Sequence, residues 1–437
     1  MNATARKRIL AALLVAAAAA RIAFGGWVVG FDAAPRGDEA DYHALAVSLA
    51  TERTFAVVDG VPTARRPPAY PAFLAGVYTA TGATPAAGRV AQAMLGVVVV
   101  WLTAALGRRL FGDAVGLVAA ALAALNPFLT FISGYLLTEN LYLVFVLAAL
   151  WLAPTPRDAT SARWWRAGLV GVLAGLATLT RPSGMPMFEW MAVAVLLLGG
   201  APWRTRFART AVVVAAFAVT VAPWCARNQR VMGGWTLTTH GGITFYQGNN
   251  HKVADVPSWR GGVAPLEALP RYDQLARMPE VGRDRLAWRL GREYLRYQWR
   301  EIPGLVGWKL VRFWRLQSDM GLSGIRSGWW WSKDSVIGRL AADVDVGFAY
   351  AVVVMPLFVA GVWSTRRRWR ELAFPYGVVA VHTAIAVVFF GSLRGRIPVE
   401  PVICIFAAAA LAALTRRLAR FRATSRSAPP PPGTSGP

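Results

Sequence analysis

The chain has 437 residues, of which 55% are hydrophobic and only 16% are charged. Globular domains carry roughly 25% charged residues, so this composition excludes both a disordered protein and a single soluble domain. Lys and Arg number 47 against 23 Asp and Glu, which gives a net charge of +24. The two cysteines, Cys225 and Cys404, adjoin or lie within apolar runs. A disulfide framework or a Cys-based metal site is therefore not expected.

Ten apolar segments are candidate transmembrane helices, which need about 20 residues, and the shorter ones could be merged or tilted. They cover about 9–29, 88–106, 114–132, 139–153, 167–180, 185–200, 210–226, 343–363, 372–390 and 398–415. A signal peptide is the alternative for the first segment, but Arg21 within a long apolar run favours a retained helix. The sequence therefore predicts an all-α polytopic membrane protein.

The basic residues fix the expected orientation. If the N-terminus is inside, 20 of the 47 basic residues fall in the inner segments: residues 6–8, 108–109, 157–166, 204–209, 366–370 and 416–426. The short outer turns carry far fewer, as the positive-inside rule predicts. We therefore expect both termini to be cytoplasmic, and the excess charge does not point to nucleic acid.

Two outer segments are long, at about 30–87 and about 227–342, and both carry amphipathic stretches at about 41–49 and 286–299. Helices of this kind can lie in the membrane interface. We expect one domain over residues 1–426, followed by a disordered, Pro/Ser/Gly-rich cytoplasmic tail at 427–437.

The first outer loop opens with an acidic cluster, Gly37-Asp38-Glu39-Ala40-Asp41-Tyr42-His43. A solvated acidic helix start explains these residue types without any function, because acids favour helix N-termini. The functional alternatives are a general base or a metal site formed by Asp38, Asp41 and His43.

The same loop ends with Arg65-Arg66-Pro67-Pro68-Ala69-Tyr70-Pro71. These residues are either an anchor at the headgroup level or a phosphate clamp, because guanidinium groups offer forked donors to phosphate oxygens. Three later outer positions add charge: Glu139 at the start of a span, Arg181 at the end of one, and Arg394 with Arg396 in the last outer turn. Acids and cations from separate spans thus gather on one side of the membrane, as a reaction that releases a phosphate would require.

These motifs, in this order, resemble membrane glycosyltransferases of the GT-C fold, in particular the dolichyl-phosphate-mannose protein mannosyltransferase-like group of family 39, to which aminoarabinose transferases are related. The resemblance covers about residues 5–415. It is carried by Gly37-Asp38-Glu39 with Tyr42, Arg66-Pro67-Pro68-Ala69-Tyr70-Pro71, Thr138-Glu139-Asn140, Thr180-Arg181-Pro182, Gly241-Gly242, Gly248-Asn249-Asn250 and Arg394-Gly395-Arg396-Ile397-Pro398.

The resemblance implies a GT-C bundle of about ten transmembrane helices with interfacial helices in the two long outer loops. It implies inverting transfer of a sugar from a polyprenyl-monophosphate donor, outside the cell membrane, to a lipid, glycan or protein acceptor. The catalytic residues implied are Asp38, Glu39 and Glu139. Asp38 matches the catalytic base, its neighbour Glu39 would orient it or the sugar, and Glu139 matches a second acid. The substrate-binding residues implied are Tyr42, Arg65, Arg66, Tyr70, Arg181, Asn249, Arg394 and Arg396.

The chain departs from the group at two points. Aminoarabinose transferases place a metal-binding acid where Arg65 stands, so no metal ligand is assigned, although a divalent metal is possible. The large outer loop is too short and too basic for the extra sugar-recognition domain of eukaryotic-type protein mannosyltransferases. The alternative function is a non-catalytic transporter or flippase of lipid-linked saccharides. Such a transporter should show inverted repeats with interrupted helices, which the sequence does not display.

Overall fold

The computed structural model describes residues 2–57, 60–154, 164–316 and 346–426, with side chains described as far as residue 419. The described residues contain no β-strand; an isolated bridge pairs Ala56 with Pro62. The predicted tail at 427–437 and part of the predicted outer loop at 227–342 lie outside the described residues. The predicted all-α architecture is confirmed.

Helices coincide with all ten predicted apolar segments. They are α1 (Ala3–Ala23) with η1 (Phe24–Val29), α4 (Pro85–Phe111), α5 (Asp113–Leu125) with α6 (Pro127–Ser133), α7 (Glu139–Leu152), α8 (Trp164–Thr180), α9 (Gly184–Leu198), α10 (Trp203–Met232), α17 (Val346–Thr365), α18 (Ala373–Val388) and α20 (Glu400–Arg426). Among the described residues, five helical segments are long and apolar enough to cross a membrane, or six if the bent pair α5–α6 is one span. The count of ten spans therefore stays a prediction.

Local sequence explains where these helices begin, end and bend. Thr84 caps α4, its hydroxyl accepting from the Ala87 N–H at 3.2 Å, and Gly112 ends the helix at φ +94°. Asn126 caps α6 by accepting from the N–H groups of Phe128 and Leu129. Because Pro127 has no N–H to continue the backbone hydrogen bonds of α5, α5 and α6 meet at an angle of 58°.

The core of the bundle surrounds the first half of α20, which packs against α17, α5 and α4. Residues 402–408 of this helix have no solvent-exposed surface. Small residues allow the close approach: a Cβ on Gly361 of α17 would lie 2.1 Å from the carbonyl oxygen of Phe406. Such contacts between small residues are typical of membrane helices. Because lipid is as apolar as a neighbouring helix, the helices associate through close van der Waals packing.

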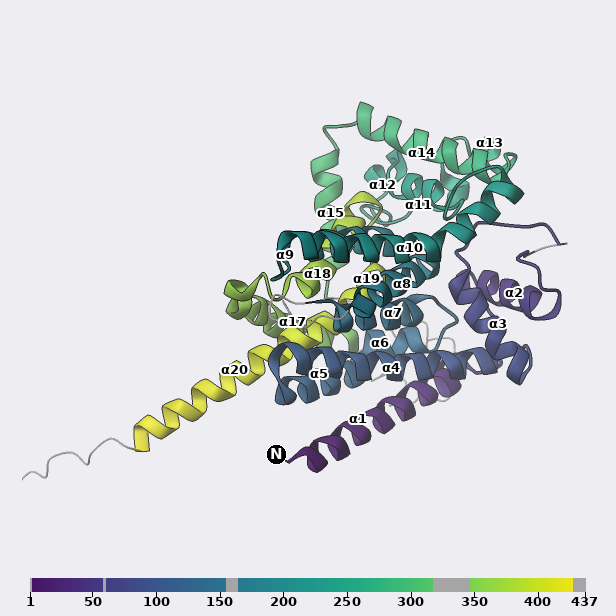
Figure 1. The fold of residues 1–437 in the computed structure, drawn as a ribbon. Helices are drawn as coiled ribbons and strands as arrows, with labels where there is room; N and C mark the ends of the chain where they lie inside the picture. The colour runs from purple at the N-terminus through teal and green to yellow at the C-terminus, as the bar shows by residue number, and fades with distance from the viewer. Residues whose placement is uncertain (1, 58–59, 155–163, 317–345, 427–437) are drawn as a thin grey trace, which may run out of the picture.

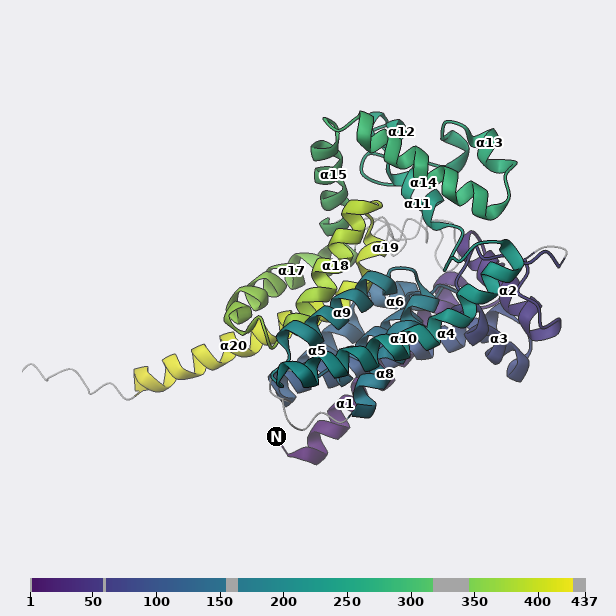
Figure 2. The ribbon, with the colours of Figure 1, turned by 45° about the horizontal axis from the view of Figure 1, so that its top comes forward.

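The two long loops also fold into helices, which lie outside the bundle of apolar helices. The first forms α2 (Asp38–Thr51) and α3 (Ala69–Thr81), and the second forms α11 (Gly241–Gly248), α12 (His251–Asp255), α13 (Tyr272–Ala276), α14 (Glu280–Tyr297) and α15 (Ile302–Trp314). A separate apolar core around Ile243, Leu286 and Leu290 holds the second group together. In Figures 1 and 2, α2 and α3 lie at the right, α11–α15 at the top, and the N-terminus and the end of α20 at the left.

Both predicted amphipathic stretches lie within helices, residues 41–49 in α2 and 286–299 mostly in α14. Helix α3 was not predicted, because prolines at 67, 68 and 71 disfavour a helix interior. The structure places Pro68 at the N-cap and Pro71 in the first turn, where a missing N–H costs nothing.

Candidate active site

The first candidate side chain, Asp38, lies at the start of α2. Two glycines and one arginine fix the position of this helix start. Gly30 and Gly37 have φ values of +83° and +55°, which L side chains rarely adopt. Between them, the buried Arg89 guanidinium donates to the carbonyl oxygens of Gly30, Phe31 and Ala33 at 2.6–3.1 Å. The chain therefore enters α2 in a fixed direction, with Asp38 as the first helical residue.

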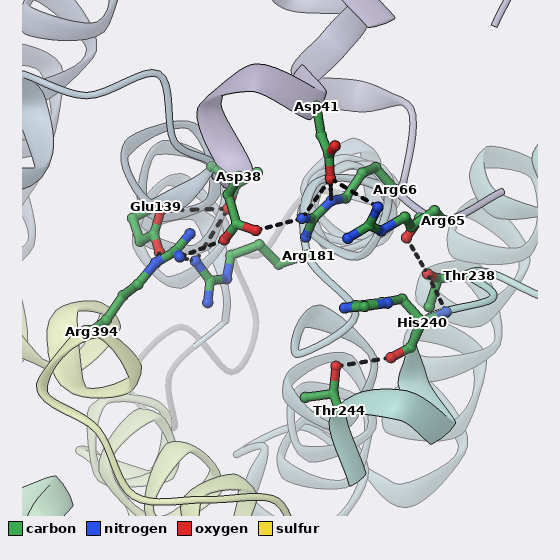
Figure 3. Close-up of polar contacts among 11 residues, drawn as sticks. Asp38, Asp41, Arg65, Arg66, Glu139, Arg181, Thr238, His240, Thr244 and Arg394 are labelled. Carbon is green, nitrogen blue, oxygen red and sulfur yellow. Dashed lines mark hydrogen bonds and ion pairs between the residues drawn. The ribbon is translucent and has the colours of Figure 1, made fainter. Parts of the chain in front are cut away.

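Asp38 belongs to a network of five charged side chains from five separate segments, which we call the acid–arginine cluster: Asp38, Arg66, Glu139, Arg181 and Arg394 (Figure 3). Arg394 bridges the two acids, donating from Nη1 to Asp38 Oδ2 at 2.6 Å and from Nε to Glu139 Oε1 at 2.5 Å. Arg66 pairs with the other oxygen of Asp38, and Arg181 pairs with Glu139. The sequence predicted all five residues as candidates, and the structure brings them together.

Glu139 is the most enclosed member of the cluster. Its side chain has no exposed surface, while that of Asp38 is 33% exposed. A buried carboxylate is retained only when cations or donors compensate for its lost hydration. Arg181 and Arg394 supply that compensation, so Glu139 holds two guanidinium groups at one place.

The arginines also set the protonation state of Asp38. Burial alone would raise its pKa, but the guanidinium groups of Arg394 and Arg66 outweigh this effect and hold the pKa well below its usual range. The pKa of Arg66 is raised above its usual value, since its neighbours Tyr42, Asp38 and Asp41 outweigh its burial. At neutral pH Asp38 is therefore an ionised carboxylate with a free lone pair and two cations beside it.

A second layer steadies Arg66. Asp41 Oδ2 accepts from its Nε at 3.1 Å and its Nη2 at 2.8 Å. The guanidinium also lies 5.1 Å from the ring centre of Tyr42, which packs edge-on against the buried Tyr70. Arg65 is 45% exposed and 3.7 Å from Asp41. Thus the predicted residues Tyr42, Tyr70 and Arg65 adjoin the cluster, and Asp41 belongs beside them.

Glu39, predicted as a partner of Asp38, points elsewhere. Its Oε1 accepts from the Leu136 N–H at 2.7 Å and lies 3.6 Å from Arg89 Nη2. Because successive residues on a helix diverge by about 100°, Glu39 faces the bundle. It ties α2 to the turn before α7 and so positions Asp38 and Glu139 relative to each other.

Two other predicted residues make separate contacts. Arg396 is buried and donates to Glu400 Oε1 at 2.8 Å and to the Arg315 carbonyl oxygen at 2.7 Å. Asn249 is buried and donates to the carbonyl oxygens of Phe245 and Val388. In the part of the chain that the structure describes, neither residue contacts the acid–arginine cluster.

The metal alternative gains no support from the geometry. Among the described residues, no group of three His, Cys, Asp or Glu side chains is arranged to hold a metal ion. His43 Nδ1, the third ligand of that alternative, instead lies 2.8 Å from the Tyr78 hydroxyl oxygen. Asp38 and Asp41 are already engaged by arginines, which leaves little negative charge for a cation.

Residues 65–225 match the family model described as dolichyl-phosphate-mannose-protein mannosyltransferase. The fold is similar to that of the archaeal oligosaccharyltransferase AglB from Archaeoglobus fulgidus in complex with an inhibitory peptide and a dolichol-phosphate, with a TM-score of 0.53, 15% identity and coverage of 98% of this chain and 52% of that chain. An oligosaccharyltransferase structure from the same organism with Zn and sulfate gives a TM-score of 0.52 and 16% identity, covering 94% of this chain and 50% of that chain. The chain has the GT-C fold.

The aminoarabinose transferase ArnT from Cupriavidus metallidurans, bound to undecaprenyl phosphate, matches at a TM-score of 0.42 and 14% identity over 98% of this chain and 82% of that chain. No curated protein matches the sequence significantly. The chain spans about half the length of the oligosaccharyltransferase chains. The GT-C fold and the long apolar helices support a protein embedded in a membrane by several helices.

The matched family segment covers only part of the cluster in this GT-C chain. Arg66, Glu139 and Arg181 lie within residues 65–225, whereas Asp38 precedes the segment and Arg394 follows it. Arg66 pairs with Asp38 and Glu139 pairs with Arg394, whereas Arg181 joins the cluster through Glu139. The cluster is thus a product of the whole fold.

Sequence reasoning missed a glutamate that joins the two outer loops of the GT-C fold. Glu280, at the start of α14, accepts from the Thr63 hydroxyl at 2.7 Å and from the Ala64 N–H at 3.1 Å. It also accepts from the Thr239 hydroxyl at 2.6 Å. The segment before Arg66 is therefore fixed to the second loop. One glutamate among several in a basic loop gave no signal of this role.

His240 is brought beside the cluster by this junction (Figure 3). Its imidazole is partly buried, and its carbonyl oxygen accepts from the Thr244 hydroxyl at 2.8 Å. Burial first, and then the charges of Arg66 and Arg65, lower the pKa of His240 to about 3. A neutral imidazole therefore faces the arginines at ordinary pH.

We expect His240 to make the fold acid-sensitive. The unfolded imidazole takes up a proton near pH 6.5, whereas the folded one does so only near pH 3. Between these values the unfolded state binds more protons, so stability falls as the pH is lowered. The thermal midpoint of H240Q should decline less than that of the wild type from pH 7 to pH 4. H251Q, which changes an exposed histidine, is the control, and identical slopes for H240Q and wild type would contradict the assignment.

A clamp formed by the second loop holds the turn that carries Arg394. Lys309 of α15 is buried and donates to Asn249 Oδ1 at 2.8 Å and to the Val387 carbonyl oxygen at 3.1 Å. Burial lowers its pKa to about 7. The Gly391 N–H donates to the Gly261 carbonyl oxygen at 3.0 Å. Asn249, predicted as a substrate-binding residue, is in this structure part of the clamp.

We expect Gly391→Ala to loosen this clamp. Its new Cβ would lie 2.0 Å from the Lys309 carbonyl oxygen, which is backbone and cannot turn away. The loss of stability should be about 1–3 kcal/mol, and the turn that carries Arg394 should shift. Gly304→Ala, at an exposed position of α15, the helix that carries Lys309, is the control, because its Cβ would meet nothing within 4 Å. Thermal midpoints of both variants check this, and equal midpoints would contradict the clamp.

Proposed function

We propose that this protein transfers a sugar from a polyprenyl-monophosphate donor to an acceptor hydroxyl, with inversion, at the extracytoplasmic face of the membrane. The observation that carries the proposal is the acid–arginine cluster. It holds one partly exposed carboxylate, Asp38, between Arg66 and Arg394. The proposed base and the proposed phosphate-binding residues are therefore neighbours, since Asp38 contacts both arginines.

The arginines suit the leaving group. When the bond between the anomeric carbon and the phosphate oxygen breaks, its electron pair passes to the phosphate, whose charge rises from about −1 to about −2. Fixed cations aimed at that position stabilise the developing charge more than they stabilise the bound donor. Arg66, Arg181 and Arg394 offer forked donors of this kind, and Figure 3 shows Arg181 between Arg394 and Arg66.

Asp38 supplies the other half of the reaction. Its carboxylate would take the proton of the acceptor hydroxyl while the hydroxyl oxygen attacks the anomeric carbon from the side opposite the phosphate. While both guanidinium groups pair with Asp38 they make it a weak base, because they hold its pKa well below the usual range. A donor phosphate would compete with Asp38 for Arg66 and Arg394. The two guanidinium groups would then stabilise the phosphate more and the carboxylate less, so the basicity of Asp38 would rise when the substrate is present.

Two further findings support the donor class and the membrane side. The structure of AglB, which shares the fold, contains a dolichol-phosphate. The cluster lies at the end of the bundle opposite the N-terminal basic segment, which the positive-inside rule assigns to the cytoplasm. A donor whose sugar is already activated by a lipid phosphate also requires no nucleotide-binding domain.

The direct test is transfer by the purified full-length protein in vesicles. Polyprenyl-phosphate mannose and polyprenyl-phosphate aminoarabinose are offered separately with soluble glycan and lipid acceptors. We expect one donor to yield polyprenyl phosphate and a glycoside of inverted anomeric configuration, which NMR spectroscopy identifies. Movement of the intact donor across the vesicle membrane, without any glycoside formed, would refute the proposal in favour of a transporter.

A further inference from the structure

Three adjoining cavities lie at the end of the bundle where α1 begins and α4 ends. Their volumes are about 240, 230 and 380 Å³. All three share Arg108; the first two also share Trp151, and the last two share Asp113. We call this group the basic cavity.

The basic cavity lies at the opposite end of the bundle from the acid–arginine cluster. Helix α7 begins with Glu139 in the cluster, and Trp151, in its last turn, lines the cavity. Helix α8 runs the other way, from Arg166 at the cavity to Thr180 beside Arg181. The cavity is therefore not a part of the proposed active site.

The charge of the lining is unbalanced. Among the described residues, five cations line the basic cavity, namely Arg6, Lys7, Arg108, Arg109 and Arg166, together with one carboxylate, Asp113. Asp113 pairs with Arg6 and lies 3.8 Å from Arg108 Nε. Arg109 donates to the carbonyl oxygens of Leu150, Trp151 and Ala153. The other four cations outnumber the described carboxylate, so the cavity favours an anion, and arginine forks match phosphate oxygens in particular.

The walls of the basic cavity are also amphipathic. Trp101 and Trp151 are 46% and 43% exposed, and both belong to apolar helices of the bundle. The cations stand at the helix ends, at the depth where headgroups lie, and the tryptophans adjoin them on the bundle side. This arrangement fits a molecule with an anionic phosphate at one end and acyl chains at the other.

We propose that the basic cavity is a binding site for the headgroup of an anionic phospholipid, with its chains along Trp101 and Trp151. Basic pockets between membrane helices on the cytoplasmic side bind such headgroups in general. The proposal differs from diffuse attraction of Arg and Lys to the membrane surface, because it requires the cations that line the cavity rather than any cations on that side. It does not depend on the proposed reaction.

The test measures the thermal midpoint of the delipidated full-length protein in an uncharged detergent during titration with phosphatidylglycerol. The variant K7Q/R108Q removes two exposed cations of the cavity, and R416Q/R417Q removes two exposed cations from the end of α20. Each cation near an anionic headgroup contributes about fivefold to binding, so K7Q/R108Q should bind about 25-fold more weakly. R416Q/R417Q should bind like the wild type.

Two comparisons decide the source of the anion. Phosphatidylcholine and inorganic phosphate at the same concentration should leave the midpoint of the wild type unchanged. Equal stabilisation by inorganic phosphate would overturn the lipid assignment, and an equal loss in both double variants would show attraction to the surface as a whole. Wild-type binding by K7Q/R108Q would overturn the site itself. The midpoints without lipid show that the variants fold.

Discussion

Replacing Asp38 by asparagine should lower the rate of sugar transfer by about 10²–10⁴-fold, the range that a positioned general base contributes. The amide keeps the shape of the side chain but cannot accept the proton of the acceptor hydroxyl. Both arginines retain a second carboxylate partner, Arg66 in Asp41 and Arg394 in Glu139. The donor phosphate site should therefore survive, so kcat should fall much more than the KM for the donor rises.

The matched control is Asp41→Asn, which removes a carboxylate that contacts the same Arg66 but does not touch Arg394. It should cause a much smaller loss of kcat, since Asp41 only holds the arginine. Transfer rates of both variants, with thermal midpoints to show that they fold, give the comparison. A near-normal rate for D38N, or equal losses for the two variants, would remove Asp38 from the role of base.

The second large effect is expected at Arg394, the only residue described as bonding to both Asp38 and Glu139. Arg394→Gln should lower transfer by about 10²–10³-fold, the usual cost of removing one fixed donor to a developing charge. Arg394→Lys should be intermediate, because a single ammonium keeps the charge but cannot reproduce the fork that reaches both acids. Donor KM should rise in both, unlike in D38N.

Arg65→Lys is the control for Arg394→Lys. Arg65 carries the same charge on the same side but is 45% exposed and only 3.7 Å from Asp41. Its replacement should change transfer by no more than a few-fold, as exposed ion pairs contribute little. If R65K lost as much activity as R394K, the phosphate site would have to be moved toward Arg65. If R394Q kept its activity, the role of the cluster in phosphate binding would be refuted.

Much of the fold could be predicted because membrane helices obey a strong local rule. A segment that crosses lipid must satisfy its own backbone hydrogen bonds, so length and hydropathy alone locate it. All ten apolar segments are helices in the structure. Their number of membrane crossings is a different question, because tilt and packing decide it, as the 58° bend after Leu125 illustrates.

Most residues of the acid–arginine cluster could also be predicted from the sequence. Charged residues at the ends of apolar segments are costly and therefore informative, which singled out Asp38, Glu139, Arg181 and Arg394. The same rule gave no means of separating Arg394 from Arg396. Both are cations in one turn, yet Arg396 points into the bundle, where it pairs with Glu400 four residues later.

The sequence by itself determined which apolar segments are helical, which of their ends carry the acids and arginines, and which residue types are available for chemistry. These properties follow from local hydropathy and from the charge pattern around each span. Only the tertiary structure decided the pairing: that Arg394 joins Asp38 to Glu139, that Glu39 turns to Leu136, and that Asn249 serves the clamp. Pairing depends on helix rotation and on contacts between residues hundreds of positions apart, which no local pattern encodes.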